Sequence, residues 1–352
     1  MLTNEQISEI REHLEKAQNP VFFFDNDCDG LMAFILLRRF IDRGRGVAIK
    51  SFPELDESYT QKIEEFGADY VFILDKPQVS KAFLEAVENM NLPVVWIDHH
   101  NINIKINGKN IFYYNPMLNK QKSNEPTSYL AYKIVKNKAD AWLALVGCIA
   151  DNYMPEFAEE FGRENPNLWG ADVASPFEVL FKTEFGRLIM TLNFALKDRT
   201  TNVVSMISLL FKIKSPSEIL IEDDKNFRIV KRYEQVNKFY QKILEKAKKI
   251  ARMSKKLVFF QYSGELSLSA DLANELSYSF PGKVIIVAYI KGAIANVSIR
   301  GNVDILSLTS GAIKNIEGAT GGGHEHATGA KMSADDLVKF KEFFERELER
   351  SR

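Results

Sequence analysis

The stretch from Val21 to Gly30 constrains the fold of this chain more than any other. Its sequence, VFFFDNDCDG, runs from four apolar residues into carboxylates at alternating positions. An apolar run that stops at turn-forming residues is typical of a buried strand in a parallel sheet, and such sheets bind ligands beyond the carboxyl ends of their strands. Asp25, Asp27 and Asp29 would repel one another there unless a cation lay between them, which favours a site for a hard divalent cation. The simpler alternative is that Asp29 caps the following helix.

The strand pattern repeats along the first third of the chain. Apolar strands are predicted over 21–24, 47–52, 70–74 and 93–97, with helices between them. Alternating strands and helices predict a parallel α/β sheet. The 352 residues exceed one ordinary domain, so two domains are expected.

Acidic and histidine residues follow three of these strands. Asp75 follows the third strand, and Asp98, His99 and His100 follow the fourth. Asp151 follows a further apolar run. Because neighbouring parallel strands bring their carboxyl ends together, these residues and the first three aspartates should converge on one crevice. Two divalent ions about 3.5–4 Å apart, bridged by a shared aspartate, would compensate their charge.

These motifs resemble those of a known family. DNDCDG at 25–30, LD at 74–75, DHH at 98–100 and AD at 150–151 look like the four motifs of the DHH phosphoesterase superfamily, and GGGH at 321–324 looks like the signature of the DHH-associated second domain. The D-x-D-x-D-G form and LDKPQ at 74–78 are similar to RecJ-like nucleases of the archaeal type. Phe23 stands where family II pyrophosphatases carry a histidine, which disfavours that activity. The length departs from that of long bacterial RecJ, which carries an additional oligonucleotide-binding domain.

The resemblance implies a fold of three parts. A parallel-sheet α/β catalytic domain would cover 1–225, a long connecting helix 226–255, and a smaller α/β substrate-binding domain 256–352. Apolar residues stepping by three or four over 226–254 predict that helix independently. Its outer face is basic, and either a solvated surface or a guide for a nucleic-acid strand would account for it.

The resemblance also implies a metal centre. Positions matching the family's metal ligands, or next to one in the case of the first residue, are Asp25, Asp27, Asp29, Asp75, His99 and Asp151. Asp75 would bridge two ions. A mixed set of histidine and carboxylate ligands suits two Mn²⁺ ions, with Mg²⁺ as the alternative. His100 would contact the scissile phosphate or orient a ligand, and Asp98 would fix the tautomer of an imidazole.

The glycine run at 318–324 is predicted not to form regular structure. Consecutive glycines let backbone approach a ligand closely and can present N–H groups to an anion. With the resemblance, this region is the expected substrate-binding face, gripping a terminal phosphate or nucleotide. Its expected residues are Ser298, Arg300, Gly322, Gly323, His324 and His326.

The function implied is two-metal hydrolysis of single-stranded DNA or RNA from an end, in a cleft between the domains that would fit a single strand better than a duplex. One alternative is a nano-RNA hydrolase that also acts as a phosphatase on 3′-phosphoadenosine 5′-phosphate. The other is a non-catalytic scaffold like the eukaryotic helicase-associated relative of RecJ, although every ligand position is intact here. A replication or repair partner is compatible with each of these, and the sequence leaves polarity, DNA or RNA preference and oligomeric state open.

Composition bounds the remaining possibilities. The net charge is −1, so contact with nucleic acid would depend on local basic patches. Two cysteines indicate a reducing compartment without a disulfide framework. With no apolar run of about 18 residues and no apolar signal segment, we expect a soluble, cytoplasmic protein without a membrane partner.

Overall fold

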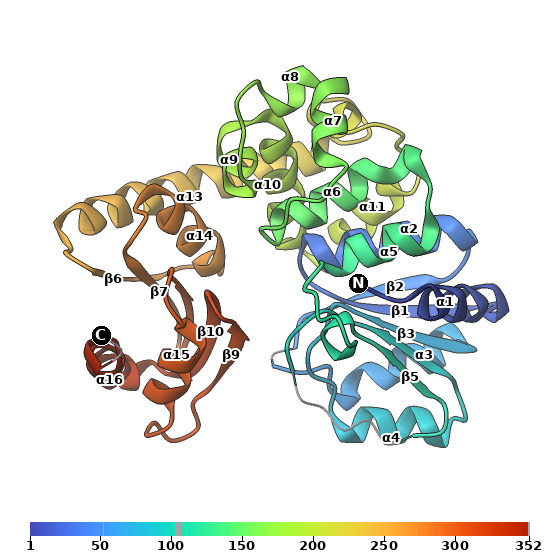
Figure 1. Ribbon diagram of the computed structural model, residues 1–352, viewed down its shortest axis with the longest axis horizontal. Coiled ribbons are helices and arrows are strands. Elements are labelled where there is room, and N and C mark those ends of the chain that lie inside the picture. Colours follow the sequence, from blue (N-terminus) through green and yellow to red (C-terminus); the bar gives the residue numbers. More distant parts are fainter. Residues whose placement is uncertain (52, 103–107, 351–352) are drawn as a thin grey trace. The chain divides into compact units, whose positions relative to one another are not determined.

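The chain folds into two units, Met1–Tyr233 and Glu234–Arg352 (Figure 1). The computed structural model describes residues 1–51, 53–102 and 108–350. The division falls inside helix α13 (Phe227–Met253), which the sequence predicts over 226–254. The finer boundaries at 225 and 255 stay a proposal about where the catalytic and substrate-binding parts end.

The first unit is built on a five-stranded parallel sheet. Its strands are β1 (Pro20–Asp25), β2 (Arg45–Ile49), β3 (Tyr70–Leu74), β4 (Val94–Ile97) and β5 (Ile111–Tyr114). Their order in the sheet is β2-β1-β3-β4-β5, and every neighbouring pair is parallel. The predicted parallel α/β fold is therefore confirmed. The sequence analysis did not predict β5, and Phe52, at the end of the strand predicted over 47–52, lies outside the described residues.

Helices cover both faces of this sheet (Figure 1). One face packs against α1 (Asn4–Lys16), α2 (Cys28–Ile41), α5 (Thr127–Val135) and α6 (Ala141–Ala150). The other face packs against α3 (Thr60–Phe66) and α4 (Lys81–Asn89). The unit also contains α7 (Ala158–Glu164), α8 (Pro166–Trp169), α9 (Pro176–Lys182), α10 (Glu184–Leu196), α11 (Thr200–Leu210) and α12 (Ser217–Leu220).

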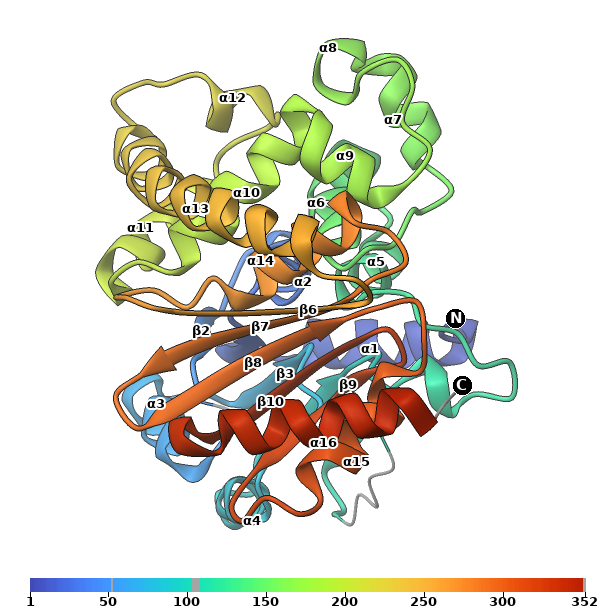
Figure 2. The same cartoon turned by 90° about the vertical axis from the view of Figure 1, so that its left-hand side faces the viewer.

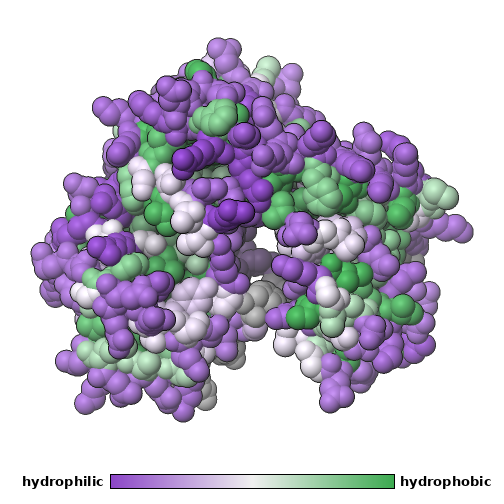
Figure 3. Space-filling model, turned by 180° about the vertical axis from the view of Figure 1, so that it is seen from behind, coloured by the Kyte–Doolittle hydropathy of each residue, from purple (hydrophilic) through white to green (hydrophobic). Residues whose placement is uncertain are grey.

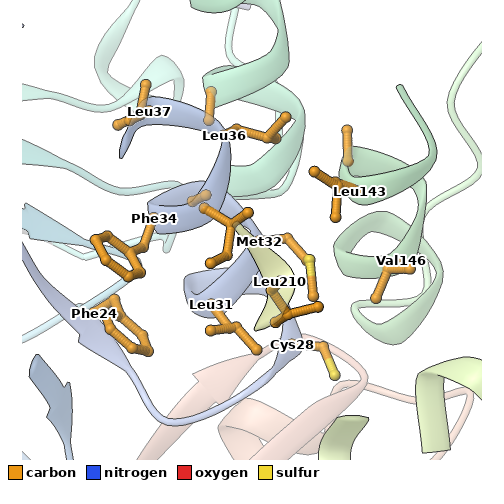
Figure 4. Packing of buried hydrophobic residues seen from close by; sticks show 14 of the residues in the cluster. Phe24, Cys28, Leu31, Met32, Phe34, Leu36, Leu37, Leu143, Val146 and Leu210 are labelled. Carbon is orange, nitrogen blue, oxygen red and sulfur yellow. The ribbon is translucent and has the colours of Figure 1, made fainter. Parts of the chain in front are cut away.

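Helix α2 lies at the centre of the first core because it is apolar on nearly every side. Residues 31–37 are all fully buried. The ring of Phe34 stacks on Phe24 of β1, with centroids 4.9 Å apart and planes 4° from parallel. Leu143 and Val146 of α6 and Leu210 of α11 belong to the same cluster (Figure 4). This packing holds the start of α2, which carries the acidic motif, against the end of β1.

The second unit contains a mixed sheet. Its strands are β6 (Leu257–Ser263), β7 (Val284–Lys291), β8 (Ile294–Arg300), β9 (Thr320–His324) and β10 (Ala327–Ser333). They lie in the order β6-β7-β8-β10-β9, and only β6 and β7 are parallel. Helix α14 (Ser269–Ser279) covers one face, and α15 (Ile305–Ile313) and α16 (Leu337–Arg350) cover the other (Figure 2). The predicted second α/β domain is thus confirmed.

The prediction that residues 318–324 form no regular structure is wrong. Residues Thr320–His324 are strand β9, an edge strand paired antiparallel with β10. The error arose because local glycine content was weighed without the ladder that β10 supplies, and backbone hydrogen bonds hold glycine extended as they hold any residue. Gly323 nevertheless has φ +139°, and a Cβ there would lie 2.4 Å from the carbonyl oxygen of Ala327.

The surface hydropathy, the apolar character of the helices and the state of the two cysteines can each be described from the structure. Viewed from behind, hydrophilic residues predominate, with hydrophobic ones scattered among them (Figure 3). Among the residues described, no helix has the length and apolar character needed to cross a bilayer. Cys28 and Cys148 are buried thiols that form no disulfide.

Replacing Phe34 by alanine should destabilise the first unit by about 3–5 kcal/mol, because it removes a fully buried ring stacked between β1 and α2. Urea unfolding measures the change. Phe40→Ala on the same helix is the matched control, since Phe40 is 38% exposed and should cost much less. Equal losses at the two positions would contradict the role given to α2.

Candidate active site

The carboxyl edge of three adjacent strands gathers the acidic motifs. Strands β1, β3 and β4 are neighbours in the sheet. Asp25 ends β1, Asp75 follows β3 directly, and Asp98 follows β4. Asp151 lies at the C-terminal end of α6. The predicted metal ligands and the DHH run therefore come from one edge of one sheet and from helices packed on it.

Asp29 links this edge to helix α5. The backbone N–H groups of Thr127 and Ser128 donate to its two oxygens at 2.7 and 3.0 Å, and the Ser128 hydroxyl donates to one of them. Asp29 is 3% exposed, so the positive end of the α5 dipole stabilises a buried carboxylate. The first two backbone amides of α5 therefore bind the Asp29 carboxylate.

Two glycines allow this close packing. A Cβ on Gly30 would lie 2.6 Å from the carbonyl oxygen of Asp25, which would break the turn from β1 into α2. A Cβ on Gly147 of α6 would lie 2.3 Å from the Ser128 hydroxyl and 2.9 Å from an Asp29 oxygen. Gly147 therefore lets α6 approach the carboxylate, a role that the sequence analysis did not identify.

Asp75 occupies an unusual backbone conformation. Its φ is +59°, in the left-handed region that residues other than glycine, asparagine and aspartate rarely adopt. The Thr127 hydroxyl donates to its Oδ1 at 3.1 Å, and the residue is 2% exposed. The sharp reversal after β3 turns the carboxylate toward α5 and the residues that follow β4.

His99 is positioned as a metal ligand would be. Its Nδ1 lies 3.1 Å from Oδ1 of Asn124, so that amide can hold the Nδ1–H tautomer. Its Nε2 lies 3.4 Å from Asp75 Oδ1 and 3.6 Å from Asp151 Oδ2. Neighbouring ligand atoms around one octahedral ion at ordinary Mg²⁺ distances are roughly 3 Å apart. The nitrogen and the two carboxylate oxygens thus have nearly the spacing that a shared cation requires.

Asp75 belongs to two groups of potential ligands in the described part of the first unit. One group is Asp29, Asp75 and His99, and the other is Asp75, Asp98 and His100, with the ligand atoms of each within 4.8 Å of one another. Oxygen and imidazole donors of this kind suit Mn²⁺ or Mg²⁺. The residues present therefore fit a divalent-metal centre, with Asp75 common to both groups.

Asp98 holds His100 in place. Nδ1 of His100 lies 2.7 Å from Asp98 Oδ1, while Tyr113 and Asn115 donate to Oδ2 at 3.2 and 3.4 Å. Burial would raise the pKa of Asp98, but the charge and hydrogen bond of His100 hold that pKa below its ordinary value. Asp98 is fully buried. It contacts Nδ1 of His100, so Nε2 is the ring nitrogen that Asp98 does not engage.

Lys76 is a buried cation that the sequence analysis did not single out. Its ammonium group is 3.2 Å from Asp25 Oδ1 and 3.2 Å from the carbonyl oxygen of Ser51, and the residue is 3% exposed. Asp25 is therefore already paired with a cation. Next to it in the chain, Oδ1 of Asn26 is buried and accepts no hydrogen bond from the described residues, as expected for an oxygen beside a site built for a cation.

The electrostatics of the cluster are those of crowded like charges. Burial, followed by repulsion from Asp29 and Asp27, raises the pKa of Asp75 well above its ordinary value. The surrounding protein and the charges of Asp25 and Asp29 also raise the pKa of Asp27, although that residue keeps an exposed surface. Burial alone would lower the pKa of His99, but the Asp75 hydrogen bond and the Asp151 charge raise it well above its ordinary value.

The residues expected to bind substrate lie together in the second unit. Ser298, Gly329 and Gly322 face one another across β8, β10 and β9, and a second row, two residues along the strands, contains Arg300, Ala327 and His324. The Ser298 hydroxyl donates to Ser269, and Nε of Arg300 donates to Asn274 Oδ1 at 2.6 Å. His326 is exposed, and its Nδ1 lies 3.1 Å from the carbonyl oxygen of Val303. Gly323 stands between the two rows on β9.

Comparison with known proteins agrees with the division of the chain into two units. The model of the DHH family, N-terminal domain, matches residues 21–154, and the model of the DHHA1 domain matches residues 255–350. No curated protein matches the chain. Asp25 to Asp151 lie within the first match, and Ser298 to His326 within the second.

Solved structures share the fold at low sequence identity. RecJ from Thermus thermophilus in complex with Mn²⁺ has a TM-score of 0.72 and 17% identity over 98% of this chain, which spans only 54% of that RecJ. An exonuclease RecJ bound to manganese has a TM-score of 0.65 and 16% identity, covering 98% of this chain and 94% of its own. CDC45 from Entamoeba histolytica has a TM-score of 0.57 and 12% identity, with 97% and 98% covered.

The metal-free protein should become less stable as the pH rises from about 6 to about 9. Both Asp75 and His99 have a folded-state pKa above the ordinary value, so the folded state binds more protons than the unfolded state in this range and loses that advantage as they leave. The pKa of Asp98 is lowered, so its effect on stability has the opposite sign, but that effect changes only in acid, below the ordinary pKa of an aspartate.

Melting curves in chelator at the two pH values test this expectation. Asp75→Asn is the comparison variant, and its melting temperature should depend less on pH. A wild-type melting temperature that rises across the interval in chelator would contradict the argument.

Proposed function

Because the chain belongs to the DHH superfamily and has a RecJ-like fold, we propose that it is a metal-dependent phosphodiesterase that hydrolyses single-stranded DNA or RNA from an end. The family matches support a phosphoesterase, and the RecJ structures with bound Mn²⁺ support the choice of metal and of reaction. The chain spans about half of the Thermus RecJ, so its substrate and partners are part of this proposal.

The observation that carries the proposal is the position of Asp75. Its carboxylate groups with donor atoms of Asp29 and His99 and also with those of Asp98 and His100, so it lies between the assigned ligands and the pair assigned to the phosphate. We propose that it is the ligand shared between two ions. We assign the remaining ligand positions to Asp25, Asp27, Asp29, His99 and Asp151. Ions held there would supply a water of lowered pKa and positive charge beside the reacting phosphate.

The residues around the ligands have separate tasks in this reaction. Attack of water on phosphorus forms one P–O bond and breaks the ester bond, and the leaving oxygen takes a proton. His100 would contact the phosphate through Nε2 while Asp98 holds its Nδ1. Asn124 would keep the Nε2 of His99 facing the ligands, and Lys76 would balance the charge of Asp25. Asp98, Asn124 and Lys76 act by position and charge and need not touch the substrate.

The second unit would bind the end of the strand. Ser298, Gly322, Gly323, Arg300 and His324 lie in three consecutive rows of one sheet, with His326 in the turn that follows β9. Charge-assisted contacts from such groups suit a phosphate. Their assignment rests on the family resemblance and on this grouping.

Digestion of end-labelled DNA and RNA tests the proposal directly. Substrates from two to about thirty nucleotides, with Mn²⁺, with Mg²⁺ and with chelator, should show cation-dependent shortening from one end, and Mn²⁺ should restore most activity to chelated protein. Turnover confined to the shortest oligonucleotides and to 3′-phosphoadenosine 5′-phosphate would favour a nano-RNA hydrolase. Full turnover in chelator would overturn the metal mechanism, and binding without any turnover would favour a scaffold.

Asp75→Asn should remove hydrolysis, with less than a tenth of wild-type turnover remaining, while the fold persists. Asparagine suits this test because it tolerates the left-handed conformation at position 75. The measurements are turnover with Mn²⁺ and a melting curve. A folded variant that keeps a tenth of the activity would show that Asp75 is not shared between ions.

Asp98→Asn should lower kcat by about 10- to 100-fold without loss of bound metal, because it weakens the hydrogen bond that orients His100. Steady-state kinetics and elemental analysis of metal content measure the two effects. The control is Asp56→Asn. Asp56 is an acidic residue outside the DHH run, and it caps the short helix Glu57–Tyr59. A variant that loses metal with its activity would make Asp98 a ligand.

A further inference from the structure

The outer face of helix α13 carries a row of cations that the metal centre does not involve. Between residues 238 and 256 the chain has eight lysines and arginines but a single acidic residue, Glu245. The basic row is defined here by its five exposed members within α13 in the second unit: Lys238, Lys242, Lys246, Lys249 and Arg252.

The packing of α13 fixes the direction of this row. Tyr240, Leu244 and Ala247 are buried, and the Tyr240 hydroxyl donates to Glu275 of α14 at 2.7 Å. At 3.6 residues per turn, Lys238, Lys242 and Lys249 fall within about 40° of one another on the opposite side of the helix. The apolar face is therefore covered by its own unit, and the charged face is the one left for a partner.

By helical periodicity Glu245 lies on the same face as the row, so this face carries five cations against one acidic residue between Lys238 and Arg252. None of its five members forms an ion pair within the described residues, whereas Lys248 beside the row pairs with Glu275 at 2.8 Å. Exposed faces elsewhere alternate in sign, as in the pairs Glu12–Lys16, Glu159–Arg163 and Lys341–Glu345. Like charges four residues apart, such as Lys238 and Lys242, destabilise a helix. A helix face whose only role was solubility would not need to retain that repulsion.

We propose that the basic row binds the phosphate backbone of a single-stranded nucleic acid, at phosphates other than the one that is hydrolysed. From Lys238 to Arg252 the row is about 21 Å long, over which a stacked strand presents about six phosphates. The choice of a single strand rests on the proposed function, whereas the affinity for phosphate rests on the row itself.

Other polyanionic partners fit these features less well. A protein interface is depleted in lysine, whereas four of the five exposed cations of this face are lysines. A helix that lies on a membrane inserts its apolar face, which here is packed within the second unit. Nucleic-acid interfaces are the more strongly positive class. A longer strand would gain contacts at the row that a dinucleotide cannot make.

The test is binding in chelator, where no hydrolysis is needed. The variant is Lys238→Gln with Lys242→Gln and Lys249→Gln, and the ligand is a labelled twenty-nucleotide oligothymidylate measured by fluorescence anisotropy at several salt concentrations. Because each phosphate contact on a single strand contributes about 0.7 to the salt dependence, the slope should fall by about 2 and affinity near 0.1 M salt by roughly 10- to 100-fold. Binding of a dinucleotide should not change.

The matched control replaces three cations of α16 by glutamine: Lys339, Lys341 and Arg346. These have the same charge and lie in the same unit, and the two lysines pair with Asp336 and Glu345. The control should bind like wild type, and an equal loss in both variants would reduce the effect to net charge and overturn the proposal. Unchanged binding of the twenty-mer by the row variant would also overturn the proposal. Polyglutamate is measured as a second ligand, and a row variant that lost affinity only for polyglutamate would overturn the proposal and assign the row to an acidic protein.

Two further comparisons separate this inference from the proposed function. A larger loss on duplex than on single strand would overturn the choice of a single strand. The wild-type protein could hydrolyse nothing with Mn²⁺ while the row variant still bound the oligonucleotide more weakly. That result would overturn the catalytic proposal and support the basic row as a binding surface. Melting curves of both triple variants ensure that each is folded when it is measured.

Discussion

Like-charge repulsion at the carboxyl edge of the first sheet is the constraint on which the rest of this structure depends. Three adjacent strands and the helices after them place carboxylates close enough for their pKa values to rise. The protein lowers the repulsion locally with the amides of α5 at Asp29 and the ammonium of Lys76 at Asp25. What these groups leave uncompensated lies around Asp75 and His99, and that is where the donor atoms have the spacing of a bound cation.

The same constraint explains why the acidic motif is attached to a buried helix. Helix α2 begins with the acidic motif and is fully buried along residues 31–37, so the carboxylates are anchored to the core of the unit. Gly30 and Gly147 permit approaches that a methyl group would prevent. The carboxylates are thus held by packing at their backbone and by hydrogen bonds at their oxygens, which is how a protein keeps repelling groups in a defined geometry.

Much of this could be predicted from the sequence because it follows from short-range patterns. Apolar runs that end in aspartate predicted three central strands and the edge where they meet. Strand β5 was missed because it has only four residues, three of them only partly buried, and β9 because its pairing with β10 is not visible in a glycine run. Contacts between distant residues were also out of reach: Asp29 meets Thr127 ninety-eight positions along, and Asn124 supports His99.

The left-handed backbone at Asp75 has an evolutionary consequence. Most substitutions there would strain the turn, whereas asparagine and glycine, each one base change from aspartate, fit the conformation and also relieve the buried charge. If Asp75 serves hydrolysis as proposed, its replacement by asparagine or glycine would therefore leave the fold as stable as before or more so. A lineage released from selection for hydrolysis could drift into a binding protein of unchanged architecture without passing through a poorly folded intermediate.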